Sequence, residues 1–429
     1  MTKLCFSKLM LALLFAFTMF SCSDDDNNGN DKPTPNPKEQ WGKTMKGNGE
    51  ELGAYPDLYS NYWEFTYNTT DSKDKIICLK GEYPHCRYFS LSLYNDETGT
   101  VINGLDDAHI QPDAGSQNPF VKTVAGKNYF TIYIVPSAQK QVATSLPSKN
   151  VIVVSDSVNR VALALRQYLG TTADGSQSDE YGGVELPAIS ALNAKTLKAT
   201  DVPKHVASNI YNITSQVFTQ ESDEDQEMPF FLAPVGRYYP NYSTAYLYAR
   251  THVHEDEVLT FSFIPAPVPT KSEEYANAVT RYWSICLGSA GDTRSYMSLC
   301  DRNARYEEGQ KSEFVVCLKK NPRLAEIKAK VDSANAAGGL VNLFVWDSEK
   351  INIDNQPIGE VIAVMYRNIL PDKNWEYSIA NMEPTEYKDE TGDPIDHVTN
   401  PEKQLAHVAL KDYGPLGTKI STEDFLNQR

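Results

Sequence analysis

The sequence predicts a mainly β protein made of two tandem homologous domains of the β-sandwich or jelly-roll type, with a few short helices. Short apolar segments rich in β-branched and aromatic residues recur along the 429-residue chain, separated by Gly, Pro, Asn and Asp. Several motifs of the first half also return, in the same order, in the second half. The chain is long enough for two ordinary domains, each with its own core.

The first 21 residues have the pattern of a signal peptide. Lys3 and Lys8 precede an apolar run at residues 9–20 that only Thr18 interrupts. A helix of this length spans about 18 Å, well short of the roughly 30 Å hydrocarbon core of a membrane. We therefore expect residues 1–21 to be removed on export rather than kept as a transmembrane helix.

The sequence around Cys22 resembles the lipobox of bacterial lipoproteins, with the small residue Ser21 before the cysteine, although Phe20 departs from the pattern. The stretch of Ser23 and three aspartates at residues 24–26 resembles the acidic export signal with which Bacteroidetes send lipoproteins to the outer leaflet. These resemblances imply that Cys22 carries acyl chains such as palmitate and anchors the protein in outer-membrane lipid, facing outward. The alternative is an ordinary cysteine after a conventional cleavage site. The polar, proline-rich residues 22–50 are expected to form a disordered tether.

Repeated motifs set the predicted domain boundaries. The paired segments are residues 55–60 and 239–243, 87–90 and 281–284, 150–157 and 342–348, and 161–168 and 361–368. Their common order predicts a first β domain at residues 51–190 and a second at 236–384. Residues 191–235 are then a linker with a helix that begins near Asp201, and residues 385–429 are a C-terminal extension.

Within each domain, five short segments have the composition of strands. In the first domain they are residues 76–79, 88–94, 129–135, 151–154 and 161–165, and in the second they are residues 258–263, 282–287, 314–318, 343–346 and 361–366. A helix is expected at residues 323–336, where the first domain has the shorter segment 138–148.

Motifs from both domains resemble a widespread family of exported bacterial proteins with two β-rich repeats and unknown function. The motifs are CRYFSL at 86–91, QPDAGSQNPF at 111–120, GGVELP at 182–187, RYWSIC at 281–286 and RNILP at 367–371. The resemblance implies β-rich domains and transfers no catalytic residue.

The composition argues against some functions and limits how the cysteines can pair. The chain has 56 acidic and 40 basic residues, a formal net charge of −16, and no basic stripe, so we expect no nucleic-acid partner. The cysteines after Cys22 are odd in number, so at least one is free or pairs elsewhere. Cys286 and Cys300 are the first pair to test for a disulfide, which export through an oxidising periplasm permits, and buried free thiols are the alternative.

Two sets of residues are candidates for ligand or metal binding. Four arginines recur at corresponding strand positions and can hold a ligand carboxylate, or can instead bond loop carbonyl groups or a buried acid. They are Arg87, Arg166, Arg281 and Arg367. His252 and His254 lie two residues apart, on one face of a predicted strand, and can begin a metal site whose third ligand the sequence does not identify. The alternative is a polar strand end before a turn.

Two further features have competing explanations. The polar loop at residues 106–113 offers oxygen ligands for calcium, with an ordinary capped loop as the alternative. The alternating aromatic residues Trp63, Phe65 and Tyr67 can stack on sugars or form the core face of a strand.

The function expected from these features is a non-catalytic, surface-exposed lipoprotein that binds a nutrient, glycan or other small ligand, beside an outer-membrane transporter. The sequence lacks a Gly-x-Ser-x-Gly elbow, a HExxH helix, a phosphate loop and a dinucleotide fingerprint, which favours a protein that is not an enzyme. We expect no cofactor, a divalent metal at the histidine pair being the alternative. An exported hydrolase or lyase acting on a glycan or small molecule remains the first alternative function, and a structural or adhesive surface protein the second.

Overall fold

The computed structural model describes residues 36–42, 44–46, 53–212, 226–233, 239–383 and 404–428. The described residues fall within one compact unit, Asn36–Arg429. We call residues 36–212 the first half and residues 226–428 the second half. The predicted signal peptide and Cys22 lie outside the described residues. No helix in the described part of the chain is both long and apolar enough to cross a membrane.

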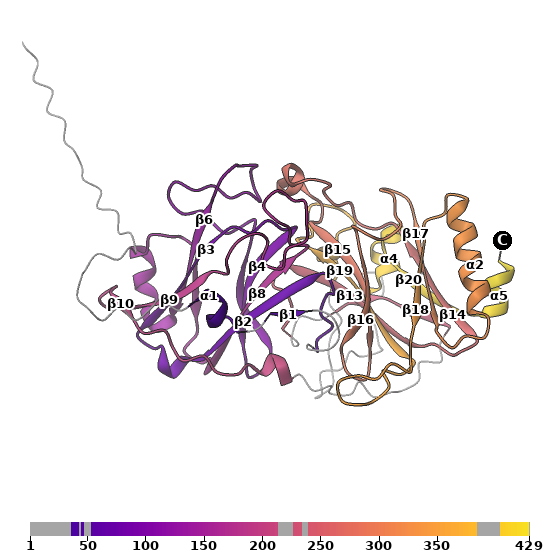
Figure 1. The fold of residues 1–429 in the computed structure, drawn as a ribbon, viewed down its shortest axis with the longest axis horizontal. Helices are drawn as coiled ribbons and strands as arrows, with labels where there is room; N and C mark the ends of the chain where they lie inside the picture. Colours follow the sequence, from indigo (N-terminus) through magenta and orange to yellow (C-terminus); the bar gives the residue numbers. More distant parts are fainter. Residues whose placement is uncertain are drawn as a thin grey trace, which may run out of the picture. The chain divides into compact units, whose positions relative to one another are not determined.

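The mainly β fold class is confirmed, because the strands form four five-stranded sheets (Figure 1). One sheet of the first half has, in spatial order, β1 (Met45–Lys46), β2 (Ser60–Asn68), β8 (Arg160–Tyr168), β4 (Tyr88–Asn95) and β5 (Thr100–Asp106). The other has β10 (Ala199–Thr200), β9 (Ala188–Asn193), β3 (Lys75–Glu82), β6 (Tyr129–Pro136) and β7 (Val151–Val154).

The second half repeats this arrangement. One of its sheets has β12 (Phe231–Leu232), β13 (Thr244–His252), β19 (Val361–Ile369), β15 (Tyr282–Ser289) and β16 (Ser295–Cys300). The other has β11 (Glu227–Pro229), β20 (Leu416–Ser421), β14 (Glu257–Phe263), β17 (Ser312–Leu318) and β18 (Val341–Trp346). In both halves the sheet-edge pair, β6 with β7 and β17 with β18, is parallel.

The strand register repeats as well. Arg166 on β8 lies opposite Ser90 on β4, and Arg367 on β19 lies opposite Ser284 on β15. Matching turns share an uncommon backbone conformation, since Leu169 and Leu370, each directly after these strands, have φ of 49° and 50°. The motifs repeated in the sequence therefore occupy equivalent places in the two halves.

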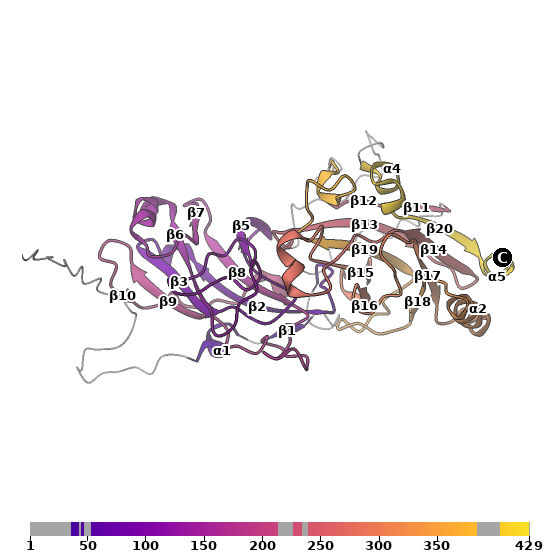
Figure 2. The same cartoon turned by 90° about the horizontal axis from the view of Figure 1, so that it is seen from above.

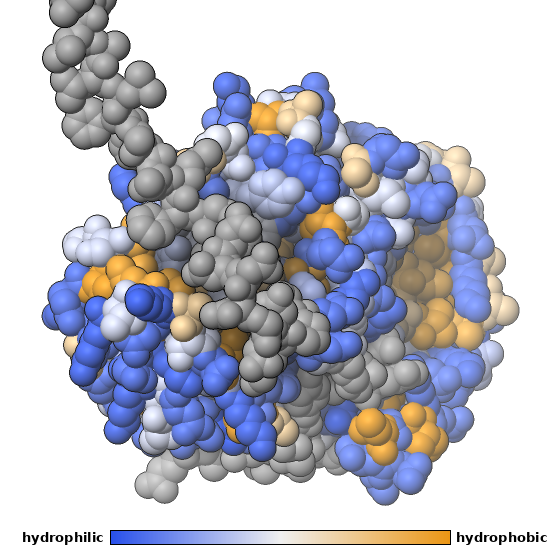
Figure 3. All heavy atoms as spheres, turned by 60° about the vertical axis from the view of Figure 1, so that its left-hand side comes forward, coloured by the Kyte–Doolittle hydropathy of each residue, from blue (hydrophilic) through white to orange (hydrophobic). Residues whose placement is uncertain are grey.

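Each half has a sandwich core between its two sheets. Trp63, Phe65 and Tyr67 of β2 are at most 3 % exposed and belong to the first core, together with inward residues of β3, β6 and β9. The aromatic row is thus the core face of a strand rather than a sugar-stacking surface. The second core joins β13, β15 and β19 to β14 and β17 in the same way. The face of the molecule in Figure 3 is mostly hydrophilic, with apolar residues in separate patches.

Helices are few and short. The expected helix at residues 323–336 is confirmed as α2 (Leu324–Ala336), whose Ile327 and Val331 pack on Val258 and Val315 of the sheet behind it. Figure 2 shows α5 (Thr422–Asn427) beside it. Among the described residues, the other helices and 3-10 turns are α1 (Pro37–Gln40), α4 (Ala406–Ala409), η1 (Thr69–Asp71), η2 (Ser137–Ser145), η3 (Asn209–Asn212), η4 (Ser272–Asn277), η5 (Ile379–Asn381) and η6 (Lys411–Tyr413).

The disordered tether predicted for residues 22–50 is wrong for residues 36–42 and 44–46. Trp41, directly after α1, is fully buried in the first core, and its indole N–H donates to the carbonyl of Pro187 at 2.6 Å. Met45, also fully buried, starts the edge strand β1. Burial of a tryptophan and a methionine explains why this stretch folds onto the domain despite its polar neighbours.

The helix predicted to begin near Asp201 is absent from residues 201–208. There the backbone N–H of Val206 donates to Thr66 of β2, and His205 contacts Glu64 at 2.9 Å, so tertiary contacts override the amphipathic pattern. Only the short turn η3 follows, and residues 213–225 lie outside the described part. At the other end of the chain, residues 385–429 were predicted to extend beyond the second domain, yet they include β20, which lies between β11 and β14 in its sheet.

The predicted disulfide between Cys286 and Cys300 is wrong, because both are free and buried. The cause is register. Cys286 lies opposite Ser298 and contacts its hydroxyl at 3.1 Å, whereas Cys300 lies opposite Ser284. The alternative of buried free thiols describes both residues.

Candidate functional site

The two halves exchange arginine–aspartate ion pairs at equivalent positions. Arg87, just before β4, contacts Asp301, just after β16, at 2.8 Å. In return Arg281, just before β15, contacts Asp107, just after β5, at 3.0 Å. Burial raises the pKa of Asp107 to about 7, against the opposing effect of Arg281. Each half therefore supplies both a cation and an anion to the contact between them.

The other two predicted ligand-binding arginines are also occupied by the protein. Arg166 donates to the carbonyl of Tyr239 at 2.6 Å, and Arg367 donates to the carbonyl of Tyr55 at 2.8 Å. Asp57 lies 3.4 Å from Arg367. For Arg166, Arg281 and Arg367, each at most 4 % exposed, the structure shows the alternative of bonds to loop carbonyls and buried acids.

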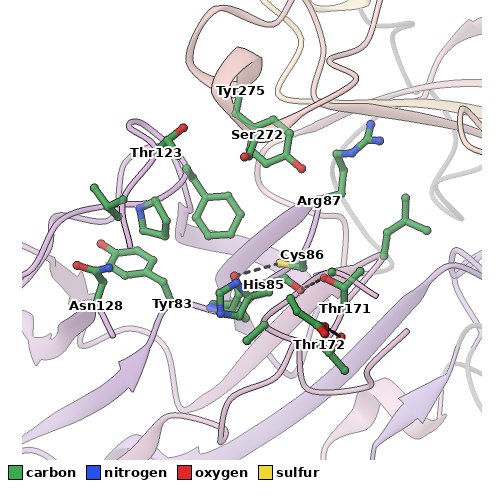
Figure 4. Close-up of a pocket in the computed structure, with 18 of the residues that line it drawn as sticks. Tyr83, His85, Cys86, Arg87, Thr123, Asn128, Thr171, Thr172, Ser272 and Tyr275 are labelled. Atoms are coloured by element: carbon green, nitrogen blue, oxygen red, sulfur yellow. Dashed lines mark hydrogen bonds between the residues drawn. The ribbon is translucent and has the colours of Figure 1, made fainter. Parts of the chain in front are cut away.

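Arg87 differs from these three because it reaches solvent. Its side chain is 15 % exposed and lines a cavity of about 620 Å³ (Figure 4). The first half contributes the turn between β3 and β4 and the loops at residues 119–128 and 169–175. The second half contributes residues 270–275 and Arg302. The cavity is thus built from several loops that lie far apart in the sequence, the usual composition of a binding site.

Aromatic side chains form part of the cavity wall. Phe120 and Tyr275 stack with ring centroids 6.2 Å apart, and the guanidinium of Arg281 lies 4.4 Å from the Tyr275 ring. The hydroxyl of Tyr83 donates to the carbonyl of Ile110 at 2.8 Å, which fixes that ring. Figure 4 shows Tyr83 and Tyr275 on opposite sides of the cavity. Tyr83 and Phe120 are each only 3 % exposed, so the aromatic surface open to a ligand is mainly that of the partly exposed Tyr275.

Polar groups lie between the aromatic residues. The Thr172 hydroxyl donates to Asp174 at 2.6 Å, and this bond, with others from Ser176, lowers the pKa of Asp174 to about 2. Asn128 is held by a bond from its amide to the carbonyl of Gly126 at 3.0 Å. The lining therefore combines hydroxyl, amide, carboxylate and guanidinium groups, which can bond a polyhydroxylated or zwitterionic ligand.

Cys86 lies in the same cavity and belongs to one of the motifs that carry the family resemblance. Burial raises the pKa of its thiol well above the ordinary value, with Asp107 adding to the effect. The thiol stays protonated at neutral pH and is a poor nucleophile. The cavity is therefore better suited to binding than to cysteine-based catalysis.

A second cluster contains the predicted histidine pair. His252 ends β13 and His254 follows it, with ring centroids 4.1 Å apart. The structure adds Glu360, which precedes β19 and lies 3.2 Å from His252. Among the described residues this is the one group of His, Cys, Asp or Glu whose spacing suits a metal ion. Strand pairing brings Glu360 to this position, and no local motif marks it.

The side-chain oxygens of the loop at residues 106–113 do not point toward a common centre that could hold a calcium ion. Asp106 accepts from the backbone N–H of Ala108, Asp107 binds Arg281, and Asp113 accepts from Thr131 at 2.9 Å. The capped-loop alternative describes these residues. Of the pocket residues, the sequence identified Arg87 alone as a candidate ligand-binding residue, because the others come from loops without a recurring pattern.

No family model and no curated protein matches this chain. The solved structures that match this chain include two with low sequence identity. An uncharacterized protein from Burkholderia cenocepacia has 10 % identity and a TM-score of 0.47, over 87 % of this chain and 79 % of that protein. The VPA0106 protein from Vibrio parahaemolyticus has 10 % identity and a TM-score of 0.36, over 74 % of this chain and 86 % of that protein. Both TM-scores lie below 0.5.

Proposed function

We propose that this protein is a surface-exposed lipoprotein, anchored through Cys22 in the outer membrane, that binds a small polar ligand in the cavity beside Arg87. The observation that carries the binding proposal is the cavity of about 620 Å³. That volume falls in the range of small-molecule sites, and the mixture of aromatic and hydrogen-bonding groups is typical of them. A mono- or oligosaccharide fits this lining best, because sugars present both an apolar face and many hydroxyl groups.

The lining also offers guanidinium groups that can bind a carboxylate of the ligand, beside the acidic side chains of Glu82 and Asp174. Arg87 and Arg302 both border the cavity, and the bond from Arg87 to Asp301 uses only its Nη1. A planar guanidinium is the preferred partner of a carboxylate. We therefore propose an acidic sugar, such as a uronic acid, ahead of a neutral one. Delivery to an outer-membrane transporter would be the role of a binding protein anchored at this place.

The binding proposal is tested with a glycan array that contains neutral and uronic-acid oligosaccharides, followed by thermal-shift measurements at millimolar ligand. We expect binding of at least one acidic glycan and a raised melting temperature with the same ligand. The matched variants are Arg302→Ala in the cavity and Arg305→Ala, which is exposed nearby but does not line it. Absence of binding on the array and of any shift with a metabolite panel would refute the proposal.

The anchoring proposal has its own test. Wild-type and Cys22→Ser proteins are expressed in a Bacteroidetes host, and intact cells are treated with an external protease. We expect wild-type protein in the membrane fraction and sensitive to the protease, and the variant in soluble form. Each buried methylene of an acyl chain contributes about 0.8 kcal/mol to membrane binding, so loss of the acyl chains removes the anchor. Equal membrane retention of the two proteins would contradict lipidation at Cys22.

A further inference from the structure

The turn between β13 and β14 holds two imidazoles on one side of the chain. Val253, between His252 and His254, is fully buried, and its N–H donates to the carbonyl of Glu360 at 3.2 Å. The backbone is thereby fixed in strand-like form, so the side chains before and after Val253 point in the same direction. The backbone bond also places the Glu360 side chain next to them.

The ligand atoms of these three residues are close to metal-binding separation. One nitrogen or oxygen from each lies within 4.8 Å of the other two, and the His252 Nε2 to Glu360 Oε2 distance is 3.2 Å. A tetrahedral zinc ion with bonds of about 2.0–2.1 Å needs ligand atoms about 3.4 Å apart. All three residues are partly exposed, so small side-chain rotations can close the remaining gap.

Lys320 orients the carboxylate. Its Nζ lies 2.5 Å from Glu360 Oε1, which leaves Oε2 directed at His252. Such an outer partner is typical of carboxylates that bind metals.

We propose that His252, His254 and Glu360 form a binding site for a divalent cation of the zinc class. Two imidazoles and one carboxylate favour Zn²⁺, Co²⁺, Ni²⁺ or Cu²⁺ over Ca²⁺ and Mg²⁺, which prefer oxygen ligands alone. His252 and Glu360 also border a cavity of about 420 Å³ with Ser348 and Glu349, so a fourth coordination position faces open space. This site shares no lining residue with the cavity beside Arg87.

The test is titration of the metal-stripped protein with ZnCl₂ by isothermal calorimetry, with CaCl₂ as the cation control. We expect one Zn²⁺ per chain and no heat from Ca²⁺. With CoCl₂ in place of zinc, bound Co²⁺ gives the intense visible absorption of a four-coordinate site. His252→Ala, His254→Ala and Glu360→Gln should each weaken zinc binding at least about tenfold.

The matched control is His109→Ala, since this exposed imidazole also contacts a carboxylate, that of Asp106, but lies outside the cluster. It should bind zinc like the wild type. Near-UV circular dichroism establishes that each variant is folded. If an alanine variant does not fold, Glu360→Gln still tests the site, because it keeps the size of the side chain. Absence of zinc binding at 100-fold molar excess, or binding that survives Glu360→Gln and either histidine substitution unchanged, would overturn the proposal.

Discussion

Asp107 is fully buried at the end of β5, and its charged partner Arg281, 2 % exposed, comes from the other half of the chain. The equivalent pair, Asp301 with Arg87, has a similar N–O distance of 2.8 Å but a partly exposed arginine. A buried ion pair contributes little beyond an apolar replacement of both partners, yet removal of one partner leaves the other charge without compensation. Loss of the acidic partner should therefore lower the free energy of unfolding by different amounts in the two pairs.

Asp107→Ala should lower the free energy of unfolding by about 3–5 kcal/mol, because it leaves the buried guanidinium of Arg281 without a compensating charge. Asp301→Ala should lower it less, since the partly exposed side chain of Arg87 borders the cavity and can turn toward solvent. Urea denaturation of the two variants, monitored by tryptophan fluorescence, measures both values. Equal losses, or a loss below about 1 kcal/mol for Asp107→Ala, would show that the buried pair does not hold the halves together.

Gly288 in β15 has no room for a side chain. A Cβ there would lie 2.5 Å from the Tyr55 ring and 2.7 Å from the backbone oxygen of Arg294. We expect Gly288→Ala to destabilise the protein by about 1–3 kcal/mol, the usual effect of overpacking. Gly291→Ala is the control, because its nearest neighbour would be the Ser289 hydroxyl at 3.5 Å. Thermal unfolding should separate the two variants, and an equal melting temperature would contradict the packing described.

At the scale of elements, the sequence predicted most of the strands whose side chains fill the cores, but its ten strand segments left out β2, β9 and β13. All ten segments expected to be strands are present, and α2 begins one residue after its predicted start. Strands such as β5 and β20 were not expected, because Gly, Thr, Asn, Asp, Lys and Ser outnumber their apolar residues. Their place is set by pairing with neighbouring strands rather than by local composition.

The role of β20 leads to a prediction at this scale. It pairs with both β11 and β14, so its removal exposes the unpaired edge of β14. Truncation of residues 404–429 should make the second half sensitive to trypsin while a first-half fragment persists. Truncation of residues 428–429 alone is the control. Unchanged protease resistance of the second half after the longer truncation would show that β20 is dispensable.

At the scale of the whole molecule, the candidate sites depend on contacts between distant parts of the chain. Asp301 lies 214 residues from Arg87, and Glu360 lies 108 residues from His252. Sequence patterns identified Arg87 and the two histidines, because repetition and strand spacing mark them. They could not identify the partners, since only the pairing of strands and the contact between halves bring these residues together. The same contact completes the cavity beside Arg87.

The central claim is that this cavity, completed by both halves, binds a small polar ligand. The direct measurement is isothermal titration calorimetry of wild-type, Arg302→Ala and Arg305→Ala proteins with the acidic oligosaccharide that gives the strongest array signal. We expect one site per chain and at least about tenfold weaker binding for Arg302→Ala, equivalent to about 1.4 kcal/mol, with Arg305→Ala like the wild type. Equal affinity of all three proteins would place the ligand elsewhere and contradict the claim.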